Sequence, residues 1–423
     1  MQSGRRHTAK QPSDRTAAGG PPRTSSHGCG KKGEDMRIGI DRFGLAIPDL
    51  YVDLREVALR RGDEPDKYTI GIGQDEQAVA PSSQDIVTLG AAAVMEFRGD
   101  IDDDRLGLLV VGTESGVDSS KASALYIHRL LGLPESVRCL EIKEACYGGT
   151  AALMMARDYV AAHPDKQALV IAADIARYGL ATSGEVTQGA AAVAMLVSAA
   201  PRVLDIHDDS IVRSEDIQDF WRPLYTDCAL TRGKYSTLKY IEFFDDVWDR
   251  YREAHGCGLD RFAALCFHLP FSKMGLKALR SVLPQAGEEQ QRKLLERYQA
   301  STRYCRRIGN AYTGSLYLGI LSLLENDDTL RAGDELGIFS YGSGAVGEFF
   351  TVSLAEGYAG NLDRDGHLAR LAHRRKLSVD EYEAVFSDKI PYSAKDYRTD
   401  EKYHAGPFVL TDVTGQERHY AAR

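Results

Sequence analysis

A cysteine placed between an apolar run and a helix-forming stretch is the residue with the clearest chemical potential in this chain. The run Val137–Ile142 is followed by Cys146, then by Gly148, Gly149 and a stretch rich in alanine and methionine. Backbone N–H groups at a helix N-terminus favour a thiolate, so this position predicts a lowered thiol pKa. The two glycines leave room for a substrate to approach the backbone. Cys146 is therefore a candidate covalent nucleophile, although a single cysteine is more often a small core residue.

Two further groups that can carry protons come at the ends of apolar runs. Glu114 comes just after the run Leu106–Gly112, and His268 ends the run that begins at Leu265. Ligands bind at the carboxyl ends of strands in open α/β sheets, and a carboxylate partly removed from water there can act as a general base or acid. Imidazole exchanges protons near neutral pH. A solvated loop glutamate and a hydrogen-bonded core histidine remain the alternatives.

Three other patterns suggest groups that bind substrate. Asn310 stands in a Gly-Asn turn ahead of a helical pattern, where its ordinary role is an N-cap. Lys273 and Lys277 share one helix face, which suits either phosphate binding or a solvated surface. The segment Tyr341–Gly347 has the spacing G-x-G-x-x-G, but a β-type run follows it, so we reject a dinucleotide site. We interpret the segment as a tight turn that provides N–H groups around Ser343 to an oxyanion hole.

Strands and helices that alternate along the chain have to position these groups. Apolar runs and amphipathic patterns predict strands over Leu106–Gly112, Ala168–Ala172, Ala191–Val197, Phe262–Leu269 and Glu335–Ser340, and helices over Asp85–Met95, Lys121–Leu131, Thr150–Ala162, Lys239–His255, Gly275–Leu283 and Leu316–Leu324. This alternation predicts an α/β protein with partly parallel sheets. Because the series occurs twice, we expect two similar halves that meet between residues 199 and 215. The charged residues from about 360 onward predict a surface appendage.

Composition excludes several classes of function. The 423 residues carry a formal charge of −9 and no basic stripe, which gives no support for nucleic-acid binding. Seven scattered cysteines without metal-binding spacing argue against a disulfide framework and a zinc site. The longest apolar run, Gly189–Ala200, is too short to span a bilayer. We expect a cytoplasmic protein with no metal and no membrane partner.

The first 35 residues differ from the rest of the chain. They contain almost no large apolar side chains, and patterned sequence starts at Met36. Such a composition cannot offset the entropy cost of ordering, which predicts disorder. The methionine at the boundary indicates that residues 1–35 could be a mis-assigned extension; an organelle transit peptide fits less well because no amphipathic pattern is present.

Taken together, these segments resemble hydroxymethylglutaryl-CoA synthases of the bacterial type, in the thiolase-fold superfamily. The motifs that carry the resemblance occur in one order between Met36 and about residue 360: Ile70-Gly-Ile-Gly-Gln, Thr113-Glu-Ser-Gly-Val-Asp, Glu144-Ala-Cys-Tyr, Ala176-Arg-Tyr-Gly-Leu, Thr187-Gln-Gly-Ala, Phe220-Trp-Arg-Pro, Phe267-His-Leu-Pro-Phe-Ser-Lys-Met-Gly, Gly309-Asn-Ala-Tyr-Thr-Gly-Ser and Tyr341-Gly-Ser-Gly. The resemblance implies a five-layered αβαβα core with two pseudo-equivalent halves, residues 36–205 and 206–423. It also implies a homodimer that uses CoA thioesters as substrates and needs no separate cofactor.

The resemblance further implies roles for individual residues. Cys146 matches the nucleophile that takes an acetyl group from acetyl-CoA, and Glu114 matches the general acid and base. His268 matches the residue that, together with Asn310, orients acetoacetyl-CoA. Tyr178 matches an active-site tyrosine, and Lys273 lies where the family contacts CoA, with Lys277 beside it. The implied product is HMG-CoA, an intermediate of the mevalonate pathway to isoprenoids.

Three other interpretations stay open from the sequence. A polyketide β-branching synthase uses the same nucleophile on substrates bound to a carrier protein. A decarboxylating ketoacyl-synthase-like enzyme relies on Cys, His and Asn, so only Glu114 separates it from the first interpretation. A non-catalytic scaffold is expected to lose at least one catalytic side chain, and here none is lost.

Overall fold

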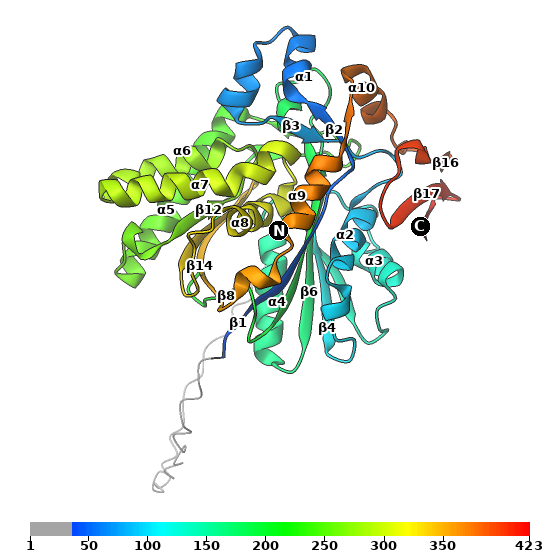
Figure 1. The fold of residues 1–423 in the computed structure, drawn as a ribbon. Helices are drawn as coiled ribbons and strands as arrows, with labels where there is room; N and C mark the ends of the chain where they lie inside the picture. The colour runs from blue at the N-terminus through cyan, green and yellow to red at the C-terminus, as the bar shows by residue number, and fades with distance from the viewer. Residues whose placement is uncertain (1–35) are drawn as a thin grey trace, which may run out of the picture. The chain divides into compact units, whose positions relative to one another are not determined.

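The computed structural model describes residues 36–423, in which a large mixed sheet is covered by helices (Figure 1). The expectation for residues 1–35, disorder or mis-assignment, lies outside the described residues. The ten strands of the sheet are β1 (Ile38–Ala46), β4 (Leu106–Gly112), β5 (Arg138–Ile142), β6 (Gln167–Ala176), β7 (Gly189–Ala199), β8 (Leu204–Ile206), β9 (Ile211–Ser214), β12 (Ala264–Phe267), β13 (Glu335–Gly342) and β14 (Val346–Leu354). Their order is β12-β13-β14-β8-β1-β7-β6-β4-β5, and β9 pairs with β14.

The pattern of strand pairing repeats in the two parts of this sheet. In the first part β4 is parallel to β6, while the pairs β6–β7 and β7–β1 are antiparallel. In the second part β12 is parallel to β13, while the pairs β13–β14 and β14–β8 are antiparallel. An antiparallel pair between β1 and β8 joins the two parts. The strands β12, β13, β14 and β8 thus repeat the pairing order of β4, β6, β7 and β1.

The helices that cover the sheet come from the amphipathic stretches between the strands. They are α2 (Ile86–Met95), α3 (Ser123–Leu131), α4 (Gly148–Ala162), α5 (Gly233–His255), α6 (Met274–Val282), α7 (Glu288–Ile308) and α8 (Ser315–Asn326). Each predicted strand and helix overlaps one of the observed elements. The sequence patterns missed α7, whose first turns are strongly charged; its buried face, which includes Tyr298 and Ile308, becomes recognisable only where it packs against α8.

The apolar strands explain why this fold forms. Successive side chains of a strand point to opposite faces, and the strands β4 and β6 are apolar on both. Val110 and Val170 pack into the core that contains the buried face of α4. Their neighbours Val111 and Ile171 pack into a second core with α2 and α3. Helices on both faces of the sheet therefore leave its strand ends as the places where polar groups can meet.

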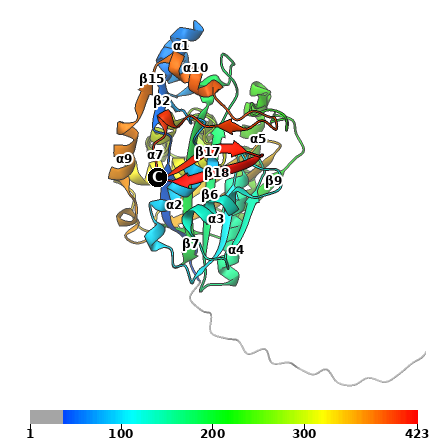
Figure 2. The same cartoon turned by 90° about the vertical axis from the view of Figure 1, so that its right-hand side faces the viewer.

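The chain after residue 360 contributes to the apolar cores, which differs from a purely superficial appendage. It forms α9 (Arg364–His373), β15 (Arg375–Leu377), α10 (Val379–Ser387), β16 (Tyr397–Arg398), β17 (Phe408–Thr414) and β18 (Glu417–Ala422). Figure 2 shows β17 and β18 in front of α2 and α3, and the buried Phe408 and Leu410 belong to the same core as these helices. Tyr382 of α10 is buried against β2 (Leu50–Asp53) and α1 (Leu54–Arg61). Charged residues conceal this pattern in the sequence because they alternate with the buried apolar positions of these short elements, and His367 and Arg374 are themselves buried.

The described residues contain neither a membrane-spanning helix nor a disulfide bond. Between residues 36 and 423, no helix combines the length and the apolarity that a bilayer crossing requires. The six cysteines in the same range are all free thiols.

Candidate active site

The Cys146 thiol lies in a sharp turn between β5 and α4. Ala145, directly before it, has a φ of 40°, a left-handed conformation that costs energy for a residue with a side chain. The hydroxyl of Tyr147 donates a hydrogen bond of 2.6 Å to Glu348 on β14, which anchors the other side of the turn. Gly112, at the end of β4, permits close packing here because a Cβ on it would lie 2.5 Å from the carbonyl oxygen of Gly148. The turn is thus held in a strained and closely packed conformation.

Glu114 reaches the thiol from the neighbouring parallel strand. The Cys146 thiol donates to Glu114 Oε1 over 3.2 Å, and Arg222 Nη2 lies 3.9 Å from Glu114 Oε2. The Glu114 side chain is 6% exposed and that of Arg222 is 16% exposed. Because β4 and β5 are parallel neighbours, the two predicted groups meet at the same edge of the sheet.

Burial shifts the pKa of both groups upward. Loss of water, together with the nearby Asp174 charge, raises the pKa of Glu114 to about 8, against the smaller opposing effect of Arg222. Burial, followed by the charge of Glu114, also raises the pKa of the Cys146 thiol well above its usual value. The lowered thiol pKa expected from the helix N-terminus is therefore wrong, because the thiol is removed from water and the charges of Glu114, Asp174 and Asp219 act in the same direction as this burial. In the free protein the thiol keeps its proton and points it at a carboxyl group.

Asp174 connects three segments of the site and was missed by the sequence analysis. One of its oxygens accepts hydrogen bonds of 2.9 Å from the Thr113 hydroxyl and from the Glu114 backbone N–H. The other oxygen accepts from the backbone N–H and the hydroxyl of Thr313. Asp174 is fully buried, so these bonds are hard to replace with water. A carboxylate inside the apolar run that forms β6 was the signal that could have revealed it.

Tyr178 lies in an aromatic group beside the thiol. Its ring centroid is 6.0 Å from that of Phe220 and 6.2 Å from that of Tyr312. Burial and the charges of Cys146 and Glu114 raise the pKa of Tyr178, so its hydroxyl keeps a proton to donate. The predicted tyrosine is therefore close to the Cys146–Glu114 pair.

Asn310 uses its side-chain oxygen to stabilise the turn before α8, and its side-chain nitrogen is available as a donor. Its Oδ1 accepts from the Tyr312 N–H and from the Ser315 hydroxyl, each over 2.8 Å, as a residue that stabilises the following turn and helix does. Its buried Nδ2 lies beside the Tyr178 hydroxyl but has no hydrogen bond of normal geometry within residues 36–423. The side-chain amide of Asn310 is therefore left with a donor for a substrate oxygen.

His268 follows β12, and its backbone is fixed on both sides. Its N–H donates to the carbonyl of Phe339 over 2.8 Å, and the Tyr240 hydroxyl donates to its carbonyl over 2.7 Å. The residue is 2% exposed, and burial lowers its pKa to about 3. The expectation that this imidazole exchanges protons near neutral pH is therefore wrong, although the neutral ring still offers one N–H donor.

The turn that contains Ser343 packs against the Cys146 turn. A Cβ on Gly342 would lie 2.6 Å from the carbonyl oxygen of Glu144, and the Gly344 N–H donates to Asp219 over 3.0 Å. The strand β14 follows directly, as expected for a turn between two strands. The glycine spacing thus serves close backbone packing, with Asp219 as a second buried carboxylate that the sequence analysis missed.

The two lysines lie at the start of α6. Lys273 is half-buried, its backbone N–H donates to the carbonyl of Ile72 over 3.2 Å, and its Cγ would lie 3.2 Å from a Cβ placed on Gly73. Lys277 is exposed, and its Nζ lies 5.4 Å from the centre of the Phe271 ring. Arg222, whose role is not visible in the motif Phe220-Trp-Arg-Pro, is the cation that the structure brings to the Cys146–Glu114 pair.

A thiol and a carboxyl group that meet at the ends of two parallel strands, on an α/β scaffold, define an acyl-transferring enzyme with a thiolase-like fold. Comparison with known proteins places it more narrowly. The family models "Hydroxymethylglutaryl-coenzyme A synthase N terminal" and "C terminal" match residues 34–201 and 286–423. The chain belongs to the hydroxymethylglutaryl-CoA synthase family, and the second match extends the likeness past residue 360 to the last residue.

Three relatives illustrate the likeness. The hydroxymethylglutaryl-CoA synthase of Enterococcus faecalis is 49% identical over 355 residues, which cover 84% of this chain and 93% of that protein. The polyketide biosynthesis 3-hydroxy-3-methylglutaryl-ACP synthase of Bacillus subtilis is 29% identical over 394 residues, with coverage of 86% and 92%. A crystal structure of an HMG-CoA synthase complexed with CoA superposes with a TM-score of 0.89 at 42% identity, covering 92% of this chain and all of that one.

Proposed function

We propose that the chain condenses acetyl-CoA with acetoacetyl-CoA to give HMG-CoA, the step of its family in the mevalonate pathway, with Cys146 as the acetyl carrier. The observation that carries this proposal is the 3.2 Å hydrogen bond between the Cys146 thiol and Glu114. A second support is the greater identity to the Enterococcus enzyme, 49%, than to the polyketide enzyme, 29%.

In the first half-reaction Cys146 attacks the thioester carbon of acetyl-CoA. Because burial keeps the thiol protonated, a base must remove its proton, and the ionised Glu114 carboxylate is in contact with it. The proton passes to Glu114 and then to the departing CoA sulfur, so that Glu114 is again a carboxylate. The backbone N–H groups of Cys146 and Ser343 are the donors for the oxyanion. The next N–H along the turn, that of Gly344, is already bound to Asp219.

In the second half-reaction Glu114 acts on carbon. It removes a proton from the methyl group of the acetyl thioester, and the enolate attacks the ketone of acetoacetyl-CoA. The protonated Glu114 then returns its proton to the new alkoxide, a task suited to a carboxyl group with a pKa of about 8. Water finally hydrolyses the Cys146 thioester, which gives HMG-CoA and the free thiol.

The remaining side chains orient the second substrate. Neutral His268 donates its ring N–H, and Asn310 donates its unpartnered Nδ2, to oxygens of acetoacetyl-CoA. Tyr178 borders the acyl site with Phe220 and Tyr312. Lys273 and Lys277 face the phosphates of CoA from the start of α6.

The test compares two cysteine variants. Cys146→Ala should form no acetyl-enzyme with labelled acetyl-CoA and no HMG-CoA. Cys139→Ala, which removes a half-buried thiol on the adjacent strand β5, should keep both. Label on Cys139, or turnover by Cys146→Ala, would refute the assignment. Tyr178→Phe should slow condensation and leave acetylation unchanged.

The polyketide alternative is separated by the acceptor substrate. With equal concentrations of acetoacetyl-CoA and of acetoacetyl carrier protein, the chain should turn over the CoA thioester with the higher kcat/KM. A preference for the carrier protein would replace the proposed substrate and leave the roles of Cys146 and Glu114 standing.

The finer architecture belongs to the same proposal. The repeated strand pairing supports two pseudo-equivalent halves, residues 36–205 and 206–423, in a five-layered αβαβα core. The half-exposed edge strand β5 supports a homodimer through this edge, in a cytoplasmic enzyme. Sedimentation equilibrium should give twice the chain mass, and a monomer would contradict the dimer.

A further inference from the structure

Gln188, part of a motif with no assigned role, holds the backbone of the active-site tyrosine. Its Oε1 accepts a hydrogen bond of 2.7 Å from the Tyr178 N–H and another of 2.9 Å from the Gly179 N–H. Gln188 is 1% exposed, so water does not compete for this oxygen. One side-chain oxygen therefore fixes two successive peptide groups of the segment that carries the Tyr178 ring.

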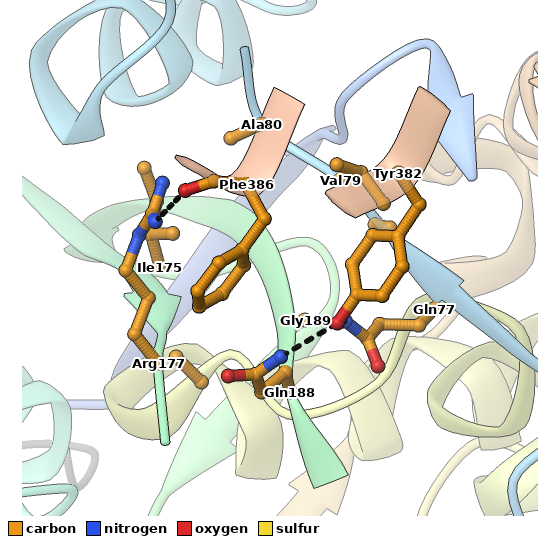
Figure 3. A pocket seen from close by; sticks show the side chains of 11 residues that line it. Gln77, Val79, Ala80, Ile175, Arg177, Gln188, Gly189, Tyr382 and Phe386 are labelled. Atoms are coloured by element: carbon orange, nitrogen blue, oxygen red, sulfur yellow. Dashed lines mark hydrogen bonds between the residues drawn. The ribbon is translucent and has the colours of Figure 1, made fainter. Parts of the chain in front are cut away.

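The orientation of the Gln188 amide is set by the C-terminal segment. Gln188 Nε2 donates to the Tyr382 hydroxyl over 3.0 Å, as the dashed line in Figure 3 shows. The same hydroxyl donates to Glu185 Oε1 over 3.1 Å, so it must accept from Gln188. Tyr382 belongs to α10 and is fully buried. A residue far along the chain thus decides which end of the Gln188 amide faces Tyr178.

Glu185 ties a third N–H group of the same segment, that of Ala181, to the same network. Its Oε2 accepts from the Ala181 N–H over 2.8 Å, and Arg61 binds both of its oxygens, over 2.9 and 2.7 Å. Arg61 also pairs with Glu383 of α10. The segment Tyr178–Ala181 is therefore held at three N–H groups by two buried side chains, and both side chains contact Tyr382.

The Gln188–Gly189 backbone also touches the segment of Asn310. A Cβ on Gly189 would lie 2.7 Å from the Asn310 nitrogen, and one on Gly309 would lie 2.0 Å from the Gln188 carbonyl oxygen. Such contacts exclude any side chain and leave no room for independent movement. A shift at Gln188 must therefore move both Tyr178 and Asn310.

The cavity beside this network does not provide another explanation for these residues. It is bordered by Gln77, Gln188, Tyr382 and Phe386 and measures about 20 Å³ (Figure 3). A space of this size is far below that of a small-molecule site. The amide of Gln188 and the hydroxyl of Tyr382, which border it, are both used in the network.

We propose that Gln188 and Tyr382 are positioning residues that set the place of Tyr178 and Asn310, so that α10 is part of the active-site scaffold. This inference rests on the proposed function of those two residues. Neither Gln188 nor Tyr382 touches the reacting atoms in this arrangement; both act through the segments that they hold.

The experiment uses three variants of the full chain. Gln188→Met removes the amide and keeps the volume of the side chain. Tyr382→Phe removes only the hydroxyl. Tyr304→Phe is the matched control, because it removes an equally buried hydroxyl bonded to a carboxylate, Glu325, outside this network. For each variant, kcat and KM for both substrates, the melting temperature and amide hydrogen exchange of the peptide that covers residues 178–181 are measured.

The expected results separate positioning from general stability. Gln188→Met should lower kcat roughly 10- to 100-fold, and Tyr382→Phe roughly 3- to 10-fold, because a small displacement of aligned groups is costly. Exchange at the Tyr178 and Gly179 amides should be about tenfold faster in Gln188→Met. Tyr304→Phe should lose melting temperature as Tyr382→Phe does and stay within about twofold of the parent kcat.

Two results would overturn the inference. The first is unchanged exchange at residues 178–181 in folded Gln188→Met. The second is a loss of kcat in Tyr382→Phe no larger than in Tyr304→Phe. Amide hydrogen exchange does not depend on the proposed function. Full activity of Tyr178→Phe would remove the role of Tyr178 in condensation. Faster exchange at residues 178–181 in Gln188→Met would still support positioning by Gln188.

Discussion

Two buried histidines of this protein have opposite pKa shifts, because the regions around them differ in the carboxylates that contact the imidazole ring. His268, which follows β12, is 2% exposed and has a pKa lowered to about 3. His367 of α9 is 1% exposed, yet its pKa is raised to about 9. Burial alone lowers the pKa of an imidazole, so the difference must come from the neighbours.

The neighbours of His367 are carboxylates on both sides. Its Nδ1 lies 2.8 Å from Glu325 and its Nε2 lies 3.0 Å from Glu96. These bonds outweigh the loss of water, the largest single effect on this group, which acts in the opposite direction. The cluster joins α9 to α2 and α8. Arg370 pairs with Glu96 as well, so the cluster holds two carboxylates and two cations.

The region of Cys146 lacks such compensation. Glu114 has the thiol and a distant Arg222 as partners, and Asp174 adds a like charge. Its pKa is raised because the ionised form is poorly stabilised. Burial therefore sets the free-energy cost of ionising a group. The neighbouring charges decide whether that group becomes a structural ion or a reactive acid and base.

The largest effect is expected from Glu114→Gln. Condensation should fall about 1000-fold, the range of general base catalysis, and acetylation of Cys146 by labelled acetyl-CoA should slow as well, because Glu114 is the base in contact with the thiol. The folded pKa of about 8 lies above the unfolded value, so at pH 7 Glu114 is ionised in the unfolded chain and mostly protonated in the fold, and this proton uptake destabilises the folded state. The free energy of unfolding should therefore rise by about 3 kcal/mol in urea denaturation. Near-normal turnover would contradict the role of Glu114 as a base. A lower free energy of unfolding in the variant would contradict the uncompensated burial of Glu114.

His367→Gln should have the opposite consequence, a loss of stability with little change in kcat. The folded pKa of about 9 lies above the unfolded value, so the stabilisation is full below the unfolded pKa and disappears as the pH rises through 9. Urea denaturation should show a loss of about 3 kcal/mol at pH 6 and a smaller loss above pH 9. The exposed His373 on the same helix provides the control, His373→Gln. A loss that does not depend on pH would refute the ionic account.

Arg222→Met should shift the pH profile rather than abolish activity. The parent kcat/KM for acetyl-CoA should fall as the pH drops through about 8, because Glu114 takes up a proton. Without the guanidinium, which lowers the pKa of Glu114, this limb should move to higher pH and activity at pH 7 should fall about tenfold. Arg232→Met removes an exposed cation 5.5 Å from the Trp221 ring on the same segment and should leave the limb in place. Equal limbs in the parent and Arg222→Met would remove the role of Arg222.

The smallest effect is expected from direct titration of the two histidines. In ¹⁵N-labelled protein, the His268 ring signals should stay constant between pH 5 and pH 8, because its pKa is about 3. The His367 signals should remain those of an imidazolium until about pH 9. A midpoint of His268 near neutral pH would show that the contrast between the two regions is absent.

The comparison also shows which parts of the site sequence patterns could predict. Cys146, Glu114, His268 and Asn310 all follow or begin regular elements, and local hydrophobic periodicity identifies such positions. Arg222 lies in the motif Phe220-Trp-Arg-Pro, which gave no sign of its partner, and Asp174 lies between the predicted strand Ala168–Ala172 and the motif that begins at Ala176. The long helix α7 was missed because its charged outer face conceals the buried one.

By itself, the sequence determined the alternation of strands and helices, the position of a thiol between β5 and α4, and the family resemblance, since each depends on residues that are near one another in the chain. Only the tertiary structure decided the signs of the pKa shifts and the identity of the positioning groups. Glu114 is 32 residues from Cys146, and Gln188 is 194 residues from Tyr382. A pKa depends on the water and charge that remain after such distant segments pack together, and no local pattern encodes that sum.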